Sequence, residues 1–219
     1  MEKKQQGIFN NFTLKMIAIC SMLIDHIGYL FFPDYLIFRA IGRIAFPIFC
    51  YLIVEGFFHT RSTWNYLIRL SAFALLSEVP FDLAFYGQVF YPGKQNVFIT
   101  LALGLCAIFC LEELNFQRLY AIPFALILVV AYFCNCDYGA GGVLLICMFY
   151  QTRENKLIQC LLCALILYLF FGTFELYGLI ALIPILLYNG KRGPSPKMIF
   201  YWFYPVHLLI LYGISYFLM

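Results

Sequence analysis

The feature that most constrains this chain is a series of long apolar runs, which begins near residue 12 and continues to the last residues. Runs of about 17–25 apolar residues have the length that an α-helix needs to cross a lipid bilayer. The chain is 64% hydrophobic and only 11% charged, whereas a soluble domain is about half apolar and a quarter charged. The pattern therefore predicts an all-α fold, a polytopic integral membrane helix bundle within the lipid bilayer.

The apolar runs predict about nine transmembrane helices in a single domain that covers residues 1–219. Because the loops are short, consecutive helices should be antiparallel neighbours. The sixth run is short and begins with glycines, which indicates a broken or re-entrant segment. The expected spans are 13–32, 36–58, 64–86, 97–112, 118–134, 139–151, 156–171, 174–188 and 198–218.

The distribution of Lys and Arg predicts the orientation, because basic residues in short loops gather on the cytoplasmic side. A cytoplasmic N-terminus and an outside C-terminus leave only Lys94 clearly in an outer loop. The basic residues that then fall on the cytoplasmic side are Lys3, Lys4, Lys15, Arg61, Arg118, Arg153, Lys156, Lys191, Arg192 and Lys197.

Charge and cysteine usage argue against two classes of partner. A net charge of +3 is too small to predict nucleic-acid binding. Most of the nine cysteines stand singly within apolar runs, as small packing residues do. We find no Cys/His spacing typical of a metal site, so no metal is expected.

Several ionisable residues lie inside the spans, where a charge costs about 2.5–3.5 kcal/mol and usually pairs or functions. Asp25 and Arg43 each lie about seven residues from the outer end of their span, so both should be about 10 Å deep and able to pair. Arg39 lies one turn above Arg43 on the same face. His26 adjoins Asp25, and His207 in the last span reaches a similar depth.

Two further polar layers flank this group. Near the cytoplasmic face, Glu55 and His59 lie four residues apart, Arg69 has a matching depth, and Arg61 and Lys15 are close by. A third group faces outward and consists of Glu78, Asp82, Asn96, Thr100, Asp137 and Tyr138.

The residues alone leave two interpretations open. In the first, the pairs Asp25–Arg43 and Glu55–Arg69 only neutralise charge and fix helix register, and His207 is a packing residue. In the second, inner cations hold the phosphates of a cytosolic donor, a His beside a carboxylate acts as general base, and outer polar groups hold an acceptor.

Six segments, in order along the chain, resemble the TraX family. They are LKMIAICSMLIDHIGYLFFP (14–33), FRAIGRIAFPIFCYLIVEGFFHTRSTWNYLIRL (38–70), SEVPFDLAF (77–85), QNVFITLALGL (95–105), DYGAGGVLLI (137–146) and YPVHL (204–208). TraX proteins are inner-membrane proteins linked to N-terminal acetylation of conjugative F-pilin. The family is similar to transmembrane acyltransferases of the acyltransferase 3 type, which pass an acyl group from cytosolic acyl-CoA to an acceptor on the far side.

The resemblance implies a multi-pass acyltransferase of the bacterial cytoplasmic (inner) membrane, with acetyl-CoA as the acyl donor. The acceptor would be an amine (a pilin or peptide N-terminus) or a hydroxyl, for example of a glycan, at the outer face. A proton-coupled transporter, or a non-catalytic membrane component of a pilus or secretion system, remains the alternative.

Carried over onto this sequence, the resemblance makes His26 the catalytic base, oriented by Asp25, with Arg43 holding Asp25 ionised or stabilising the oxyanion. His207 becomes the second catalytic candidate. Transfer is either direct or through an acetyl-histidine. The residues expected to line the CoA route are Glu55, His59, Arg61, Arg69 and Lys15. The residues expected to hold the acceptor are Glu78, Asp82, Asn96, Thr100, Asp137 and Tyr138.

Overall fold

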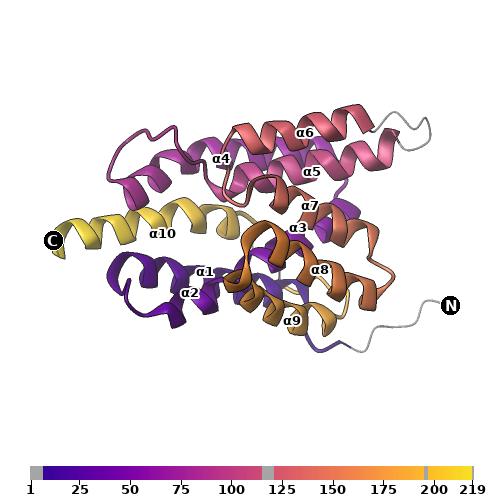
Figure 1. The fold of residues 1–219 in the computed structure, drawn as a ribbon, viewed down its shortest axis with the longest axis horizontal. Helices are drawn as coiled ribbons and strands as arrows, with labels where there is room; N and C mark the ends of the chain where they lie inside the picture. Colours follow the sequence, from indigo (N-terminus) through magenta and orange to yellow (C-terminus); the bar gives the residue numbers. More distant parts are fainter. Residues whose placement is uncertain (1–6, 115–120, 195–196, 219) are drawn as a thin grey trace.

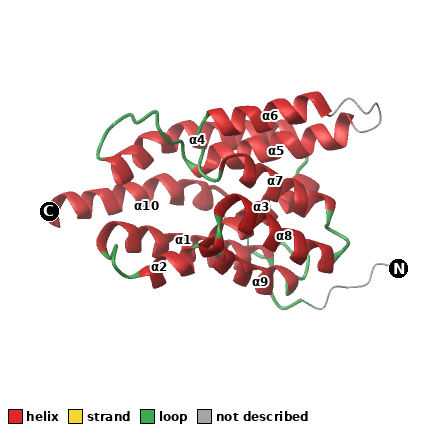
Figure 2. Ribbon diagram, viewed as in Figure 1, coloured by secondary structure: helices red, strands yellow, loops and turns green. Residues whose placement is uncertain are grey.

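The computed structural model describes residues 7–114, 121–194 and 197–218. Within these residues the chain forms a bundle of helices, connected by short loops (Figures 1 and 2), with two isolated β-bridges and no longer strand. The elements are α1 (Asn11–Phe31), α2 (Leu36–Gly42), α3 (Ala45–His59), α4 (Thr63–Tyr86), α5 (Val97–Leu114), α6 (Ala121–Phe133), α7 (Gly139–Gln151), α8 (Lys156–Phe171), the 3₁₀ helix η2 (Thr173–Ala181), α9 (Leu182–Leu186) and α10 (Lys197–Leu218).

The predicted spans are confirmed as helical segments, with boundaries that differ by a few residues; the start of the fifth span lies outside the described residues. Three helical stretches are long and apolar enough to cross a membrane, namely Asn11–Phe31, Leu36–His59 and Met198–Leu218. Shorter apolar helices cover Ala121–Phe133, Gly139–Gln151, Lys156–Phe171 and Thr173–Leu186. The fold is therefore all-α, with membrane-like helices.

The second predicted span is not one continuous helix, because it breaks at Arg43 and Ile44 between α2 and α3. Pro47 explains the break. It has no N–H to bond the carbonyl four residues earlier, which belongs to Arg43, and its ring clashes with that carbonyl. The carbonyl of Arg43 instead lies close to Gly178, where an added Cβ would be 3.1 Å away. The break places Arg43 at a bend within the bundle.

Two other spans differ from expectation. The sixth, α7, is continuous rather than broken, because its three glycines all lie in the first turn. The eighth is a 3₁₀ helix, η2, followed by the short α9, and Pro184 removes a hydrogen-bond donor at their junction. The 3₁₀ form rises about 2.0 Å per residue, so η2 spans a greater length than an α-helix with the same number of residues.

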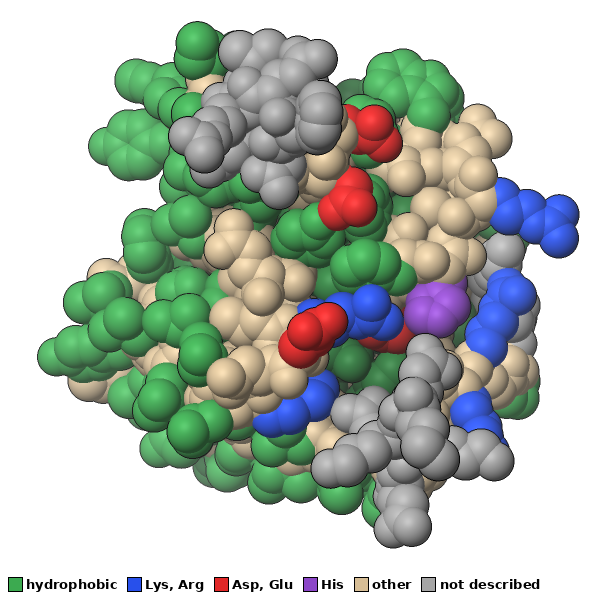
Figure 3. All heavy atoms as spheres, turned by 90° about the vertical axis from the view of Figure 1, so that its right-hand side faces the viewer, with side chains coloured by type: hydrophobic (Ala, Val, Ile, Leu, Met, Phe, Trp, Pro, Cys, Tyr) green, Lys and Arg blue, Asp and Glu red, His purple; other side chains and the backbone are tan. Residues whose placement is uncertain are grey.

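The antiparallel order gives the bundle two ends. We call the end with the α3–α4, α7–α8 and α9–α10 turns the inner end, and the opposite one, with the α1–α2 and α4–α5 turns, the outer end (Figure 1). Lys, Arg, acidic and His side chains gather on the inner end (Figure 3). Lys3, Lys4, Arg118 and the side chain of Lys197 lie outside the described part of the chain.

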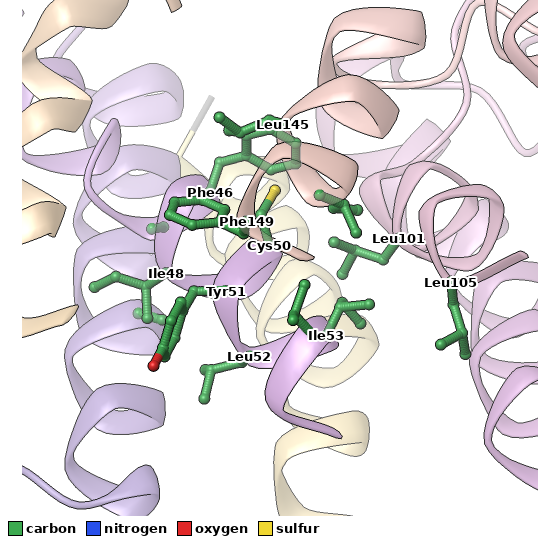
Figure 4. Close-up of a cluster of buried hydrophobic side chains, with 14 of the residues drawn as sticks. Phe46, Ile48, Cys50, Tyr51, Leu52, Ile53, Leu101, Leu105, Leu145 and Phe149 are labelled. Atoms are coloured by element: carbon green, nitrogen blue, oxygen red, sulfur yellow. The ribbon is translucent and has the colours of Figure 1, made fainter. Parts of the chain in front are cut away.

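Helix α3 forms the centre of the bundle. Its residues from Ala45 to Glu55 are buried or nearly so, and it packs against α1, α5, α7 and η2. A helix that is apolar on all sides is stable only when neighbours surround it. Phe46, Tyr51 and Phe149 contribute to the apolar cluster around it (Figure 4). The ionisable residues of α1 and α2 therefore meet beside a rigid core.

Candidate functional site

A pair of histidines joins the first and last helices. Nδ1 of His26 on α1 lies 2.8 Å from Nε2 of His207 on α10, and Nδ1 of His207 lies 2.7 Å from the backbone carbonyl of Phe203. A carbonyl only accepts, so His207 carries its proton on Nδ1. Nε2 of a neutral His207 is then an acceptor, and His26 must donate from its own Nδ1. Nε2 of His26 consequently keeps a free lone pair.

A buried ion network lies beside the histidines. Asp25 accepts from Arg39 Nη1 at 2.6 Å and from Arg43 Nη2 at 2.8 Å, while Arg43 Nη1 donates to Glu175 at 2.5 Å. The predicted pair Asp25–Arg43 is thereby confirmed, and Arg39 joins it from the same face. Two carboxylates balance two guanidinium groups, so the network is neutral.

The network changes the expected roles of two residues. Both carboxylate oxygens of Asp25 are engaged by arginines, so the hydrogen bond that orients His26 comes from His207. Arg43 uses Nε, Nη1 and Nη2 within the network. Arg39 has one such bond to a carboxylate and its side chain is 27% exposed. Arg39 is therefore the guanidinium with more donors available to a ligand.

Gly42 allows the network to form. A Cβ at this position would overlap the carboxylate of Asp25. Gly42→Ala is therefore expected to displace Asp25 and to destabilise the protein, although alanine is intrinsically the better helix former by about 1 kcal/mol. The matched control is Gly213→Ala on α10, where an added Cβ meets no atom within 4 Å. Thermal unfolding in detergent should show a lower midpoint for the first variant only; equal midpoints would contradict this role of Gly42.

His26 and Asp25 line a small cavity of about 160 Å³, which we call the outer cavity. Arg39, Arg43 and Tyr138 also contribute to its wall. Tyr29 lies at the same site, with the Arg39 guanidinium 5.1 Å from its ring centre. The wall of the outer cavity is about as polar as it is apolar, and it brings together a histidine lone pair, cations and a phenol, the kind of convergent polar groups that orient a ligand.

Tyr138 reaches the outer cavity with an unusual backbone. Its φ is +64°, which is strained for a bulky side chain. The ring stacks on Phe46 with 3.5 Å between the ring centres. Strained residues of this kind gather at functional sites, and here the strain aims the ring at the outer cavity.

Asp137 and Lys94 border the outer cavity from two loops at the outer end. Lys94 Nζ lies 3.0 Å from an Asp137 carboxylate oxygen. Burial alone would lower the pKa of Lys94, but the Asp137 carboxylate outweighs it and raises the pKa above its ordinary value. The ion pair therefore persists at neutral pH and joins the two loops.

The other four residues expected to hold the acceptor do not line either cavity described here. Asp82 accepts from the backbone N–H of Tyr91 at 2.8 Å, and Glu78 accepts from the side chain of Asn96. Thr100 donates to the backbone carbonyl of Asp137. In the structure the hydrogen bonds of these groups hold the outer loops in place. Their role in binding an acceptor stays a prediction.

A second, larger cavity of about 610 Å³ opens at the inner end, and we call it the inner cavity. All five residues that we expected along a CoA route line it, namely Lys15, Glu55, His59, Arg61 and Arg69. Arg192 joins the same wall. The volume lies within the range of about 300–1,000 Å³ that is usual for ligand and cofactor sites.

Glu55 has other partners than expected. Its carboxylate lies 3.7 Å from Arg153 Nη2 and 3.9 Å from His59 Nδ1, whereas no ion pair with Arg69 is found among the described residues. Arg69 lies over the ring of Tyr66, 5.7 Å from its centre. The pairing with Arg153 neutralises the acid, and it leaves the positive charge of Arg69 available to the inner cavity.

Sequence reasoning missed Glu175 and Arg153. A signal for Glu175 was present: Arg39 and Arg43 both lie within one helical turn of the depth of the single acid Asp25, so a neutral site needs a second carboxylate. Glu175 is an acid within the eighth apolar run. Arg153 had no comparable signal, because a basic residue in an inner loop is already explained by orientation.

The fold and the site define a helical membrane protein with buried ionisable residues beside two cavities. The profile of the TraX protein family matches residues 11–215, and the chain belongs to this family.

Two relatives extend the comparison. A "Probable fimbrial assembly protein FimC, serogroup H1" of Dichelobacter nodosus is 32% identical over 241 aligned residues, which cover 96% of this chain and 97% of the relative. An "Uncharacterized protein RP591" of Rickettsia prowazekii (strain Madrid E) is 24% identical over 65% of this chain and 56% of its own length. No solved structure matches the chain.

Proposed function

We propose that this protein is a membrane-embedded acyltransferase, which moves an acetyl group from acetyl-CoA at the inner end to an acceptor at the outer end. The observation that carries the proposal is the juxtaposition of two cavities. A large basic cavity at the inner end adjoins a small cavity that contains the free lone pair of His26.

The inner cavity suits the donor. Lys15, Arg61, Arg69 and Arg192 place positive charge around it, and guanidinium groups bind phosphates with charge-assisted hydrogen bonds. Much of its remaining wall is apolar and aromatic, which suits the apolar carbons of a pantetheine arm. Acetyl-CoA in this cavity would enter from the cytoplasm.

The outer cavity suits the transfer step. His26 Nε2 takes a proton from the attacking amine or hydroxyl as general base, while a bond forms between the nucleophile and the thioester carbonyl carbon. Arg39 donates to the carbonyl oxygen as negative charge develops there. The carbon–sulfur bond then breaks, and the protonated His26 returns its proton to the CoA thiolate. Attack by His26 itself, through an acetyl-histidine, is the alternative order of these steps.

The sidedness of this reaction requires an orientation in the membrane. We propose a multi-pass protein of the bacterial inner membrane, with a cytoplasmic N-terminus and an outside C-terminus. The basic residues of the inner end, Lys15, Arg61, Arg153, Lys191 and Arg192, support the proposal because basic loops remain in the cytoplasm.

The acceptor we propose is the N-terminal amine of a pilin or another exported peptide. Support comes from the printed name of the Dichelobacter nodosus relative, which is a probable fimbrial assembly protein and aligns with nearly the whole chain. A glycan hydroxyl is the other acceptor that the same chemistry would serve.

Purified protein tests the proposed reaction directly. With acetyl-CoA and a peptide that has a free N-terminus, we expect appearance of the CoA thiol together with acetylated peptide, identified by mass spectrometry. An N-terminally blocked peptide is the control. If neither thiol nor acetylated product forms with amine or hydroxyl acceptors, the protein is not an acyltransferase, and a non-catalytic role in fimbrial assembly is favoured.

The basic wall of the inner cavity gives a separate prediction. The double variant Arg61→Gln/Arg69→Gln should raise the KM for acetyl-CoA about a hundredfold or more, because each of two lost hydrogen bonds to a charged group contributes about 1.5–3 kcal/mol. The kcat should change little, since these residues line the inner cavity and not the outer cavity, where the proposed transfer takes place. Lys191→Gln is the control, because Lys191 is exposed at the same end and does not line the cavity. Equal KM values for all three proteins would rule out donor binding by this wall.

A further inference from the structure

Four side chains from four helices line both cavities: Met22 on α1, Phe49 on α3, Val97 on α5 and Tyr204 on α10. We call them the junction. Because each residue contributes to both walls, the junction separates the inner cavity from the outer one. A group that passes from one cavity to the other has to pass these side chains.

The junction lies directly beside His26. Met22 precedes His26 by four residues on α1, so the two side chains project from the same face, one turn apart. The ring of Tyr204 lies 6.4 Å from the His26 ring and 5.6 Å from the His207 ring, centre to centre. Met22 is 8% exposed and Tyr204 is 4% exposed, so both are held by packing.

The space beyond the junction is small. A cavity of about 150 Å³ holds a molecule the size of benzene, and the outer cavity has about 160 Å³. This space must contain both the acyl group and the attacking atoms of the acceptor. An acetyl group leaves room for the acceptor, whereas a six-carbon acyl chain would fill the cavity by itself.

We propose that the junction residues Met22 and Phe49 set the acyl-chain length, so that the protein selects acetyl over longer acyl groups. The inference rests on the proposed acyltransferase function. The thioester reaches His26 through the junction, and the acyl chain then lies in the outer cavity, whose wall includes Met22 and Phe49. Shortening Met22 enlarges this cavity and so makes room for a longer chain.

The test is an acyl-length profile. Acetyl-, butyryl-, hexanoyl- and octanoyl-CoA are compared as donors to one peptide acceptor, for the wild type and for Met22→Ala. Each excess methylene in a filled pocket is worth about tenfold or more in kcat/KM. We therefore expect the wild type to discriminate steeply against hexanoyl-CoA, and Met22→Ala to raise the hexanoyl-to-acetyl ratio at least tenfold.

Met148→Ala is the matched control, because Met148 on α7 is 6% exposed and lines neither cavity. It makes the same deletion and should leave the ratio unchanged. Phe49→Leu is a second widening variant and should change the ratio in the same direction as Met22→Ala.

The outcomes separate the inference from the proposed function. If acetyl transfer occurs and neither Met22→Ala nor Phe49→Leu changes the acyl-length profile, or if Met148→Ala changes it equally, the junction does not select the chain. If no protein transfers any acyl group, the proposed function fails, and the inference fails with it.

Discussion

Replacing His26 by Gln is expected to lower the rate of acetyl transfer about 10²–10⁴-fold, the usual contribution of a general base. The amide approximates the shape of the imidazole but cannot accept a proton at neutral pH. Binding of acetyl-CoA should persist, because the inner cavity is not lined by His26. Measuring kcat and the Kd for acetyl-CoA on the same preparations separates the two effects. A His26→Gln protein with the wild-type kcat would remove His26 from the mechanism.

His207 is expected to act through His26. It lines neither cavity, and its hydrogen bond to Phe203 fixes the proton arrangement of both rings. His207→Ala should lower kcat less than His26→Gln and should change the pH dependence of kcat, because the partner of His26 Nδ1 is lost. A residue that only packs would change stability without changing the pH profile.

The second large effect is expected at Arg43, the residue that joins Asp25 and Glu175. Arg43→Met should destabilise the protein by about 3–5 kcal/mol, because removing one partner leaves a buried carboxylate uncompensated. Arg39 still neutralises Asp25, so Glu175 is the group left without a cation. Unfolding in detergent, followed by circular dichroism, measures the loss.

A second substitution tests the cause. The double variant Arg43→Met/Glu175→Gln also removes the unpaired carboxylate charge of Glu175. It should therefore regain part of the stability lost in Arg43→Met, although it carries two changes. Arg61→Met is the control, because Arg61 is exposed at the inner end and surface changes are usually within about 0.5 kcal/mol. If the double variant is less stable than Arg43→Met, the ion network does not explain the stability of this region.

Counting residues along the sequence predicts how deep each site residue lies in the bundle. It does not predict the direction in which each side chain points around its helix axis. Counting residues from the outer ends placed Asp25 and Arg43 at one level, and the ion pair follows from the α1–α2 hairpin. The same counting brought His207 to the level of His26. The contact between His26 and His207 depends on the packing of α1 against α10. Apolar periodicity does not predict this packing, because helices that are apolar on all sides show no preferred face.

Polar residues at the outer end show another limit. The sequence shows that four residues are polar, but it does not show with which groups they form hydrogen bonds. These residues are Glu78, Asp82, Asn96 and Thr100. In the structure they form hydrogen bonds with backbone and side-chain groups of the outer loops and of α4. Loop backbone needs such partners wherever water is excluded, and that need depends on the fold of the loop rather than on residue type.

Proline chemistry accounts for two helix breaks but does not predict them by itself, because α4 continues through Pro80 and α10 continues through Pro205. Pro47 and Pro184 lie within continuous apolar runs, so hydropathy alone predicts one helix for each run. The rule that a proline releases the carbonyl four residues earlier indicates the bend at Arg43. That bend turns a span into two helices, and it positions the guanidinium between Asp25 and Glu175.

Transfer across a sealed membrane tests the central claim most directly. Protein is reconstituted into vesicles with labelled acetyl-CoA on one side and a peptide with a free N-terminus on the other; His26→Gln vesicles serve as the control. We predict labelled peptide on the side opposite to acetyl-CoA, in intact wild-type vesicles only. Label that reaches the peptide only when both substrates share one side, or no labelled peptide in any arrangement, would contradict transfer through the bundle.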